Sequence, residues 1–221
     1  MSRRHRPANT LSFTRRLLAW FRANGRDLPW RATRDPYHVL VSEFMLQQTQ
    51  VSRVAAYYPR FLRRFPTVAH LARANPAQVR EAWDGLGYYR RAANLHRLAR
   101  TVMVEHGGAV PDDPATLESL PGIGKYTAGA VASFAFERRA PAVDTNALRV
   151  LQRVFRPRHD HGTGRERAVR ELAQRILPAR RRTVWEFNQA LMDLGSSYCT
   201  ARRPKCAGCP VRPACRTGRS R

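Results

Sequence analysis

The sequence predicts an all-α protein, and three observations support this fold class. Apolar residues such as Phe13, Leu17 and Phe21 recur at the spacing of one helix face. No segment alternates apolar and polar residues as a run of half-buried strands would. Gly, Pro, Asn and Asp interrupt the chain between the apolar stretches, where helices end and begin. We therefore expect a succession of helices joined by short turns.

The first two helices have identifiable ends. Residues 11–24 carry the first apolar stripe, and Gly25 directly after them ends the helix. Asp35 and Pro36 then begin the second helix, residues 37–50, because Asp caps a helix well and Pro suits its first turn.

The same apolar spacing between punctuating residues predicts the remaining helices. They are expected at residues 51–65, 68–74, 76–84, 90–106, 114–119, 125–136, 145–155, 165–177 and 185–198. The polar stretch 156–165 is expected to be an exposed loop, and residues 217–221 are expected to be frayed.

The chain has a strong positive charge. Its 221 residues include 40 Lys and Arg against 16 Asp and Glu, a formal net charge of +24. Codon bias can explain a preference for Arg over Lys but not this excess of basic residues, so we expect a nucleic-acid partner. No apolar run approaches the roughly 20 residues that span a bilayer, and no apolar segment follows the basic N-terminus as in a secretory signal. We expect no membrane association and a cytoplasmic, nucleoid-associated protein.

All four cysteines lie near the end of the sequence, at Cys199, Cys206, Cys209 and Cys215, with the spacing C-x6-C-x2-C-x5-C. A segment this short cannot bury a core of its own, so a bound group is needed to hold it together. Four thiolates would hold either a structural zinc ion or a [4Fe–4S] cluster, and the spacing alone leaves both open. Two disulfides are less favoured, because nothing directs the chain to an oxidising compartment.

Residues 120–128, Leu-Pro-Gly-Ile-Gly-Lys-Tyr-Thr-Ala, predict a tight turn between two helices. Gly122 and Gly124 allow the chain to turn sharply, while Ile123 between them faces the core. The backbone amides at the helix start beside Lys125 suit a phosphate oxygen. The alternative is an ordinary corner between two helices that binds nothing.

This hairpin, the segment Pro-Ala-Val-Asp at 141–144 and the final cysteines together resemble the helix–hairpin–helix DNA glycosylases of the endonuclease III superfamily. Four further segments resemble the adenine glycosylases of the MutY type: Leu-Pro-Trp-Arg at 28–31, Ser-Glu-Phe-Met-Leu-Gln-Gln-Thr-Gln-Val at 42–51, Gly-Leu-Gly-Tyr-Tyr at 85–89 and Phe-Asn-Gln-Ala-Leu-Met-Asp-Leu-Gly at 187–195. The resemblance extends over residues 11–215.

The resemblance implies a two-domain helix–hairpin–helix DNA glycosylase fold with a C-terminal iron–sulfur cluster loop. A six-helix barrel domain with the hairpin would comprise residues 27–139, and the cluster domain would comprise residues 1–26 and 140–221, with DNA between the two. The four cysteines would bind a [4Fe–4S] cluster rather than zinc. The partner would be double-stranded DNA containing a mismatch, bound by a monomer.

Glu43 is the candidate general acid. On a helix it shares a face with Val39, Leu40 and Leu46, so we expect apolar surroundings. Burial disfavours the charged form of a carboxyl group and keeps a proton available near neutral pH. A solvated glutamate on the surface is the alternative. The resemblance implies that Glu43 protonates N7 of adenine, otherwise a poor leaving group, and later assists the incoming water.

Asp144 is the candidate partner of this acid. It directly precedes a predicted helix start, where the helix dipole and free amides suit an ionised carboxylate. A plain N-cap is the alternative. The resemblance implies that its charge stabilises the oxocarbenium-like sugar left when the glycosidic bond breaks. It also implies that Tyr126 and Asn146 help to order the site.

The resemblance further predicts base removal without efficient strand cleavage. Bifunctional relatives attack the sugar with a lysine amine to form a Schiff base, and Tyr126 stands at that position in this chain. Lys125 is its neighbour, about 100° around the helix and therefore aimed elsewhere. We expect a monofunctional glycosylase of base excision repair.

Four residues are candidates for entering the DNA stack, which a glycosylase must open to extrude its base. Gln48 and Tyr88 resemble the wedge residues of the family, and Thr49 and Leu86 resemble the residues that face the opposing base. Without the resemblance, Gln48 would be interpreted as a surface polar residue and Tyr88 as a core aromatic residue.

The candidate base pocket consists of three residues. Arg31 and Gln189 match positions that line the adenine pocket in the family. Trp30 could stack there as well, although an aromatic residue in this context is as often part of the core. The implied substrate is adenine mispaired with guanine or 8-oxoguanine.

Three other functions remain open at this point. A thymine or uracil mismatch glycosylase would share the Glu, Tyr and Asp, but the segments at 42–51 and 85–89 favour adenine. A bifunctional endonuclease III-like glycosylase and AP lyase would need the lysine. A non-catalytic DNA-binding protein would need neither carboxyl group. MutY-type enzymes usually continue into a C-terminal domain that recognises 8-oxoguanine, whereas this chain ends six residues after Cys215, so we expect a short form with altered specificity.

Overall fold

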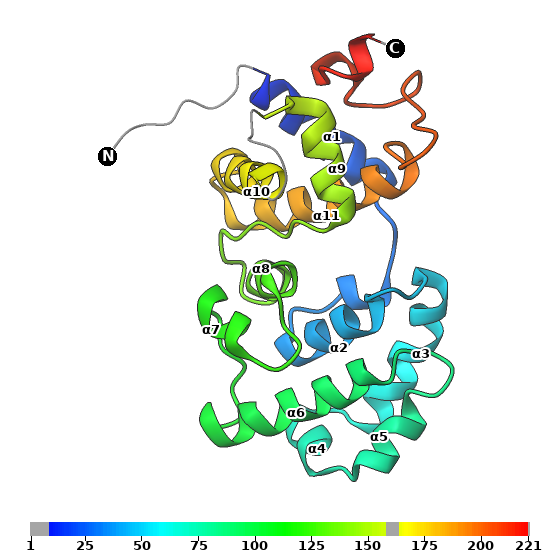
Figure 1. Ribbon diagram of the computed structural model, residues 1–221, viewed down its shortest axis with the longest axis vertical. Coiled ribbons are helices and arrows are strands. Elements are labelled where there is room, and N and C mark those ends of the chain that lie inside the picture. Colours follow the sequence, from blue (N-terminus) through cyan, green and yellow to red (C-terminus); the bar gives the residue numbers. More distant parts are fainter. Residues whose placement is uncertain (1–8, 158–163, 221) are drawn as a thin grey trace. The chain divides into compact units, whose positions relative to one another are not determined.

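The computed structural model describes residues 9–157 and 164–220, and all regular structure in these ranges is helical (Figure 1). The predicted all-α class is confirmed. The chain divides into two compact units: the middle unit is Asp27–Arg138, and the terminal unit combines the described residues of Met1–Arg26 and Arg139–Arg221. Most of the loop predicted at 156–165 lies outside the described residues. None of the helices in the described ranges combines the length and the apolar character needed to cross a membrane.

The middle unit is built around one buried helix, α2. Its elements in chain order are η1 (Pro29–Arg31), α2 (Pro36–Leu46), α3 (Val51–Arg64), α4 (Val68–Arg73), α5 (Pro76–Ala82), α6 (Arg90–Glu105), α7 (Pro114–Ser119) and α8 (Lys125–Phe134). α2 packs against α3, α6 and α8, while α4 and α5 pack against α6. Every residue of α2 from Val39 to Met45 is buried, including the polar Ser42 and Glu43 among their apolar neighbours.

Three helices of the middle unit begin with a polar cap followed by proline. Asp35, Asn75 and Asp113 each accept a hydrogen bond from a backbone amide of the first turn of α2, α5 and α7. The cap satisfies an amide that has no partner within the helix, and the proline after it loses nothing because its position needs no donor. These local signals explain why the three helices begin within one residue of the predicted positions.

α7 and α8 form the predicted hairpin and pack against each other. Gly122 in the turn has φ 79°, and a Cβ at this position would lie 2.8 Å from the Cβ of Asn94. Only glycine fits both conditions without strain. Ile123 is buried and anchors the turn in the unit, while the backbone at Gly122 and Gly124 is exposed.

The terminal unit is a second helical cluster. Its elements are α1 (Thr10–Asn24), α9 (Thr145–Phe155), α10 (Gly164–Ile176), α11 (Arg181–Ser197), η2 (Arg212–Ala214) and η3 (Gly218–Ser220). α11 packs against α1 and α9, and α10 packs against α9. The ring of Phe13 meets those of Phe155 and Phe187 edge to face at 5.2 and 6.2 Å. Val211 and Ala214 of the cysteine segment join this core, so the segment shares the core of the helices.

Three helix or chain ends differ most from the prediction. α2 ends at Leu46 instead of continuing to residue 50, because the backbone leaves the helical conformation at Gln47, with ψ 112°, and Gln48 after it has φ 55°. α11 begins at Arg181, four residues earlier than predicted, because the three polar residues 181–183 before the buried Val184 carry no apolar pattern. The frayed end predicted after residue 216 is wrong for residues 217–220, since η3 forms there and Thr217 Oγ1 donates to the backbone oxygen of Arg153 at 2.8 Å.

Candidate functional site

Glu43 lies on α2 in the middle unit and is 4% exposed. Its neighbours Ser42 and Phe44 are buried too, and Ser42 Oγ donates to the backbone oxygen of Val39 within the same helix at 2.8 Å. The alternative of a solvated surface glutamate is therefore wrong. A carboxyl group withdrawn from water favours its neutral form, which is the form that a general acid needs.

Asp144 is the N-cap of α9 in the terminal unit. Its Oδ1 accepts a hydrogen bond from the amide of Ala147 at 2.7 Å, and its Oδ2 accepts one from Asn146 Nδ2 at 2.8 Å. Both donors and the helix N-terminus present positive partial charge to the carboxylate. Capping and a catalytic role are compatible here, because the bonds that cap the helix also hold the carboxylate in one orientation.

Asn146 is in turn fixed between α9 and α11. Its Oδ1 accepts a hydrogen bond from Arg149 Nη2 at 2.7 Å, and the same nitrogen donates to the backbone oxygen of Gly195 at 2.8 Å. α11 passes so close that a Cβ on Gly195 would lie 2.6 Å from the Cβ of Asn146. Glycine at 195 is therefore what allows the two helices to approach each other beside Asp144.

Gly195→Ala is expected to destabilise the terminal unit. The added methyl group meets the Cβ and backbone of Asn146, which cannot move without shifting α9. Overpacking of this kind costs about 1–3 kcal/mol, so the variant should unfold at a lower temperature than the wild type in a thermal melt. Ser196→Ala, at the next and exposed position, is the matched control. An unchanged melting temperature in Gly195→Ala would contradict this packing argument.

The candidate wedge residues occupy two turns of the middle unit, residues 47–50 and 85–88. Gln48 is exposed and Tyr88 is 61% exposed, so the alternative of Tyr88 as a core aromatic residue is wrong. Thr49 is half-buried. Leu86 is only 3% exposed, so in this structure its side chain is buried and stabilises the turn at 85–88.

Arg91 joins these two turns, a role that the motifs in the sequence do not reveal. It lies in the first turn of α6 and is 7% exposed. One signal was present in the sequence: Arg91 falls on the same helix face as Leu95 and Leu98. A cation on an apolar face needs partners from elsewhere in the fold.

The candidate base-pocket residues are divided between the two units. Trp30 and Arg31 are neighbours in η1 of the middle unit, and Gln189 lies in α11 of the terminal unit. Trp30 is buried and packs edge-on against Tyr58 with ring centroids 5.7 Å apart, so it contributes to the packing of its unit. Gln189 is 5% exposed. The pocket itself stays a prediction.

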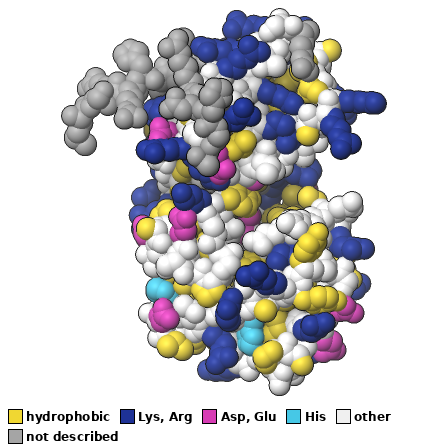
Figure 2. All heavy atoms as spheres, viewed as in Figure 1, with side chains coloured by type: hydrophobic (Ala, Val, Ile, Leu, Met, Phe, Trp, Pro, Cys, Tyr) yellow, Lys and Arg dark blue, Asp and Glu magenta, His cyan; other side chains and the backbone are white. Residues whose placement is uncertain are grey.

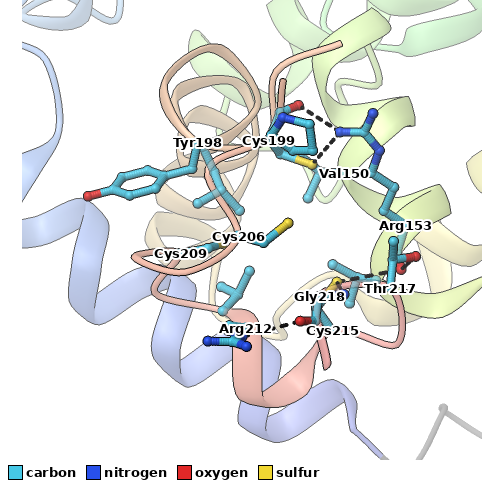
Figure 3. Close-up of a pocket in the computed structure, with 14 residues that line it drawn as sticks. Val150, Arg153, Tyr198, Cys199, Cys206, Cys209, Arg212, Cys215, Thr217 and Gly218 are labelled. Atoms are coloured by element: carbon cyan, nitrogen blue, oxygen red, sulfur yellow. Dashed lines mark hydrogen bonds between the residues drawn. The ribbon is translucent and has the colours of Figure 1, made fainter. Parts of the chain in front are cut away.

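The four cysteines line one cavity of the terminal unit, which is partly open to solvent (Figure 3). Val150, Leu194 and Val211 form much of the remaining wall, so the sulfurs stand in largely apolar surroundings. Burial raises the pKa of the Cys209 thiol to about 11. None of the four cysteines forms a disulfide, and the disulfide alternative is wrong.

One side-chain donor and one backbone amide form hydrogen bonds to these sulfurs. Arg153 Nη1 donates to Cys199 Sγ at 3.4 Å, and the amide of Gly218 donates to Cys215 Sγ at 3.2 Å (Figure 3). Arg153 also donates to backbone oxygens of the loop that follows Cys199. Hydrogen bonds to sulfur of this kind stabilise negative charge on thiolate ligands.

The chemistry of these side chains fits a [4Fe–4S] cluster. A [4Fe–4S] cluster takes one thiolate per iron, so its cysteines surround a space. A cavity bounded by four thiols and amide donors provides such a space.

Comparison with known proteins relates this chain to DNA repair. A family model described as HhH-GPD superfamily base excision DNA repair protein matches residues 41–179. Curated relatives named adenine DNA glycosylase are 47% identical over 196 residues in Mycobacterium tuberculosis and 44% identical over 220 residues in Rattus norvegicus. The alignments cover 88% and 95% of this chain but 64% and 42% of the relatives. The chain therefore spans less than two thirds of their length.

Two solved structures have a similar fold. A thermostable thymine-DNA glycosylase matches with a TM-score of 0.86 and 30% identity, covering 96% of this chain and 98% of that chain. Endonuclease III in a trapped covalent intermediate with DNA matches with a TM-score of 0.80 and 25% identity, covering 95% of each chain.

Proposed function

Because this chain belongs to the HhH-GPD superfamily of base excision DNA repair proteins, we propose that it is a monofunctional DNA glycosylase that removes adenine mispaired with guanine or 8-oxoguanine. One observation carries the proposal, the contrast between two carboxyl groups. Glu43 is withdrawn from solvent in a buried, largely apolar helix, whereas Asp144 is held by two hydrogen bonds at a helix start. Such a contrast suits one neutral acid and one ionised carboxylate.

The proposed reaction uses the two groups in sequence. Neutral Glu43 gives its proton to a ring nitrogen of adenine while the bond between base and sugar breaks and its electron pair leaves with the base. The sugar becomes an oxocarbenium-like cation, which the negative charge of Asp144 stabilises. Water then adds to the sugar carbon and gives a proton to the Glu43 carboxylate, which restores the acid.

The residues beside the hairpin support base removal without strand cleavage. Tyr126 is half-buried in the first turn of α8, and Lys125 before it is exposed. Lys205 is exposed in the cysteine segment. A phenol cannot form a Schiff base with the sugar, so the chain lacks an amine at the position where bifunctional relatives carry one.

The proposed partner is double-stranded DNA that contains the mismatch, bound by a monomer. Figure 2 shows Lys and Arg side chains spread over the face in view, with few Asp or Glu among them. The exposed backbone of Gly122 and Gly124 at the start of α8 suits a phosphate group. Arg202 and Arg203, also exposed, add positive charge in the cysteine segment.

We propose further that the four cysteines hold a [4Fe–4S] cluster, which when bound supplies a rigid, redox-capable cross-link for the cysteine segment. Cys215→Ser is expected to yield purified protein with much less iron and acid-labile sulfide than the wild type, and with a terminal unit that unfolds at lower temperature. Ser196→Ala should keep the wild-type content. Metal analysis of the wild type that finds zinc without sulfide would contradict the cluster.

Thymine or uracil opposite guanine is the second candidate substrate, and one observation favours it. The solved structure of a thymine-DNA glycosylase has the same fold as this chain, with a TM-score of 0.86. Sequence identity favours adenine, with 47% against 30%. We therefore place adenine first.

A substrate panel tests the proposal directly. Purified protein is incubated with labelled duplexes that carry A·G, A·8-oxoG, T·G or U·G, and cleavage is measured with and without alkali. Adenine release from the first two duplexes, visible only after alkali, is the expected result. Release from T·G or U·G alone would overturn the substrate, and strand breaks without alkali would overturn the monofunctional assignment.

A further inference from the structure

The hydrogen bonds that Arg91 makes within the described chain all end on neutral oxygens. Nη1 donates to the backbone oxygens of Phe44 at 3.0 Å, Met45 at 2.8 Å and Gln47, and Nη2 donates to Thr49 Oγ1 at 2.9 Å and to the backbone oxygens of Leu86 at 3.2 Å and Gly87 at 3.1 Å. One planar guanidinium therefore links the turn after α2 with the turn before α6. Lysine cannot replace this pattern, because its single ammonium lacks the fork of donors.

Both turns contain backbone conformations that need support. Gln48 has φ 55° and Tyr88 has φ 49°, values that residues other than glycine rarely adopt. Such strain persists only where the surrounding structure holds it. Arg91 binds the residues on both sides of Gln48 and the residue directly before Tyr88, so it supports each strained position through its neighbours.

The guanidinium is also fixed to the core of the middle unit. The central carbon of the guanidinium, Cζ, lies 5.6 Å from the ring centroid of Trp83 and 5.4 Å from that of Tyr88. Both distances are within the range of cation–π attraction. Trp83 is fully buried, and its Nε1 donates to the backbone oxygen of Gly87 at 3.2 Å. Arg91 thus connects a core aromatic residue to an exposed one.

We propose that Arg91 is a positioning residue that sets the turns at 47–50 and 85–88 in one fixed relation before DNA binds, so that Gln48 and Tyr88 enter the duplex as a preformed pair. The consequence for DNA rests on the proposed glycosylase function; the link between the turns does not. Turns that are already ordered lose little conformational entropy on binding, and more of the interaction energy is available to open the base stack.

Hydrogen exchange of the free protein tests the link itself. In Arg91→Met, amides of residues 46–50 and 85–88 are expected to exchange at least about tenfold faster than in the wild type, because charged hydrogen bonds to both turns are lost. Amides of α7 and α8 should be unchanged. In Arg91→Lys, the single ammonium group lacks the fork of donors that binds both turns. Exchange should therefore accelerate more in one turn than in the other. Arg100→Met removes an exposed arginine from the same helix and is the matched control.

Two exchange results would overturn the proposal. The first is wild-type exchange in both turns of Arg91→Met. The second is equal acceleration throughout the middle unit, which would mean that Arg91 serves stability in general. If Arg91→Met does not fold, Arg91→Lys is measured instead, and wild-type exchange in its two turns contradicts the proposal.

A DNA experiment then tests the consequence. Duplexes carry 2-aminopurine in place of the adenine of the A·8-oxoG pair, and its fluorescence reports base opening. Arg91→Met is expected to bind an undamaged duplex like the wild type, to open the base at least about tenfold less and to slow single-turnover excision by a similar factor. Equal opening in Arg91→Met and wild type would overturn the proposal. If the wild type excises no base, the proposed function is overturned. The hydrogen-exchange result then tests by itself whether Arg91 links the two turns.

Discussion

Glu43→Gln is expected to abolish base excision while leaving duplex binding nearly unchanged. Gln has the shape of Glu and can occupy the same buried position in α2, but its amide has no acidic proton to give to the departing adenine. Loss of a general acid lowers a rate by about 10²–10⁴-fold. Single-turnover release of adenine from a labelled A·8-oxoG duplex measures the effect, and titration of the same duplex measures binding.

Glu105→Gln is the matched control for this variant, because it makes the same change at an exposed position of the middle unit. Its excision rate should equal that of the wild type. Retained excision in Glu43→Gln would exclude Glu43 as the acid. Loss of duplex binding together with a lower unfolding temperature would show that Glu43 supports the fold of α2 instead of the reaction.

Asp144→Asn is expected to slow excision strongly with little change in stability. The Asn oxygen can still accept the hydrogen bond of the Ala147 amide, and Asn caps helices as well as Asp does. The variant loses the negative charge opposite the developing sugar cation, an effect of roughly 10²–10³-fold for comparable electrostatic groups. It also loses the hydrogen bond that Asp144 Oδ2 accepts from Asn146 Nδ2. Comparison of excision rates with thermal unfolding separates the charge from the cap.

Asp35→Asn makes the same exchange at another N-cap, where Asp35 accepts a hydrogen bond from the amide of His38 at 3.0 Å. It should leave excision unchanged. If Asp144→Asn excises adenine as fast as Asp35→Asn, then Asp144 is a cap and nothing more. Asp144→Ala provides a further comparison, because it removes both charge and cap and should also lower stability by about 1 kcal/mol.

Local signals predicted much of the fold. The starts of α2, α5 and α7 follow from a polar cap beside a proline, and the hairpin follows from two glycines around Ile123. The burial of Glu43 follows from the apolar residues on its helix face, which the structure confirms. Each of these features depends on residues within about one or two helical turns of each other, and helical periodicity makes such relations visible in a sequence.

The spacing of the cysteines was not sufficient to predict which group they hold. The pattern of Cys199, Cys206, Cys209 and Cys215 by itself allowed zinc or a cluster. The cavity that the four residues surround, and the donors from Arg153 and Gly218, come from parts of the chain that the spacing does not describe.

The sequence alone determined the helical character of the chain, its basic charge and the hairpin. Its resemblance to a known family singled out Glu43 and Asp144 as candidates. Only the tertiary structure decided which distant groups meet. Arg91 reaches carbonyl oxygens more than 40 residues away, and Gly195 is required because α11 approaches Asn146. The reason is physical: side-chain periodicity records which face of a helix is buried, whereas a contact to a distant backbone oxygen leaves no pattern in the residues that supply it.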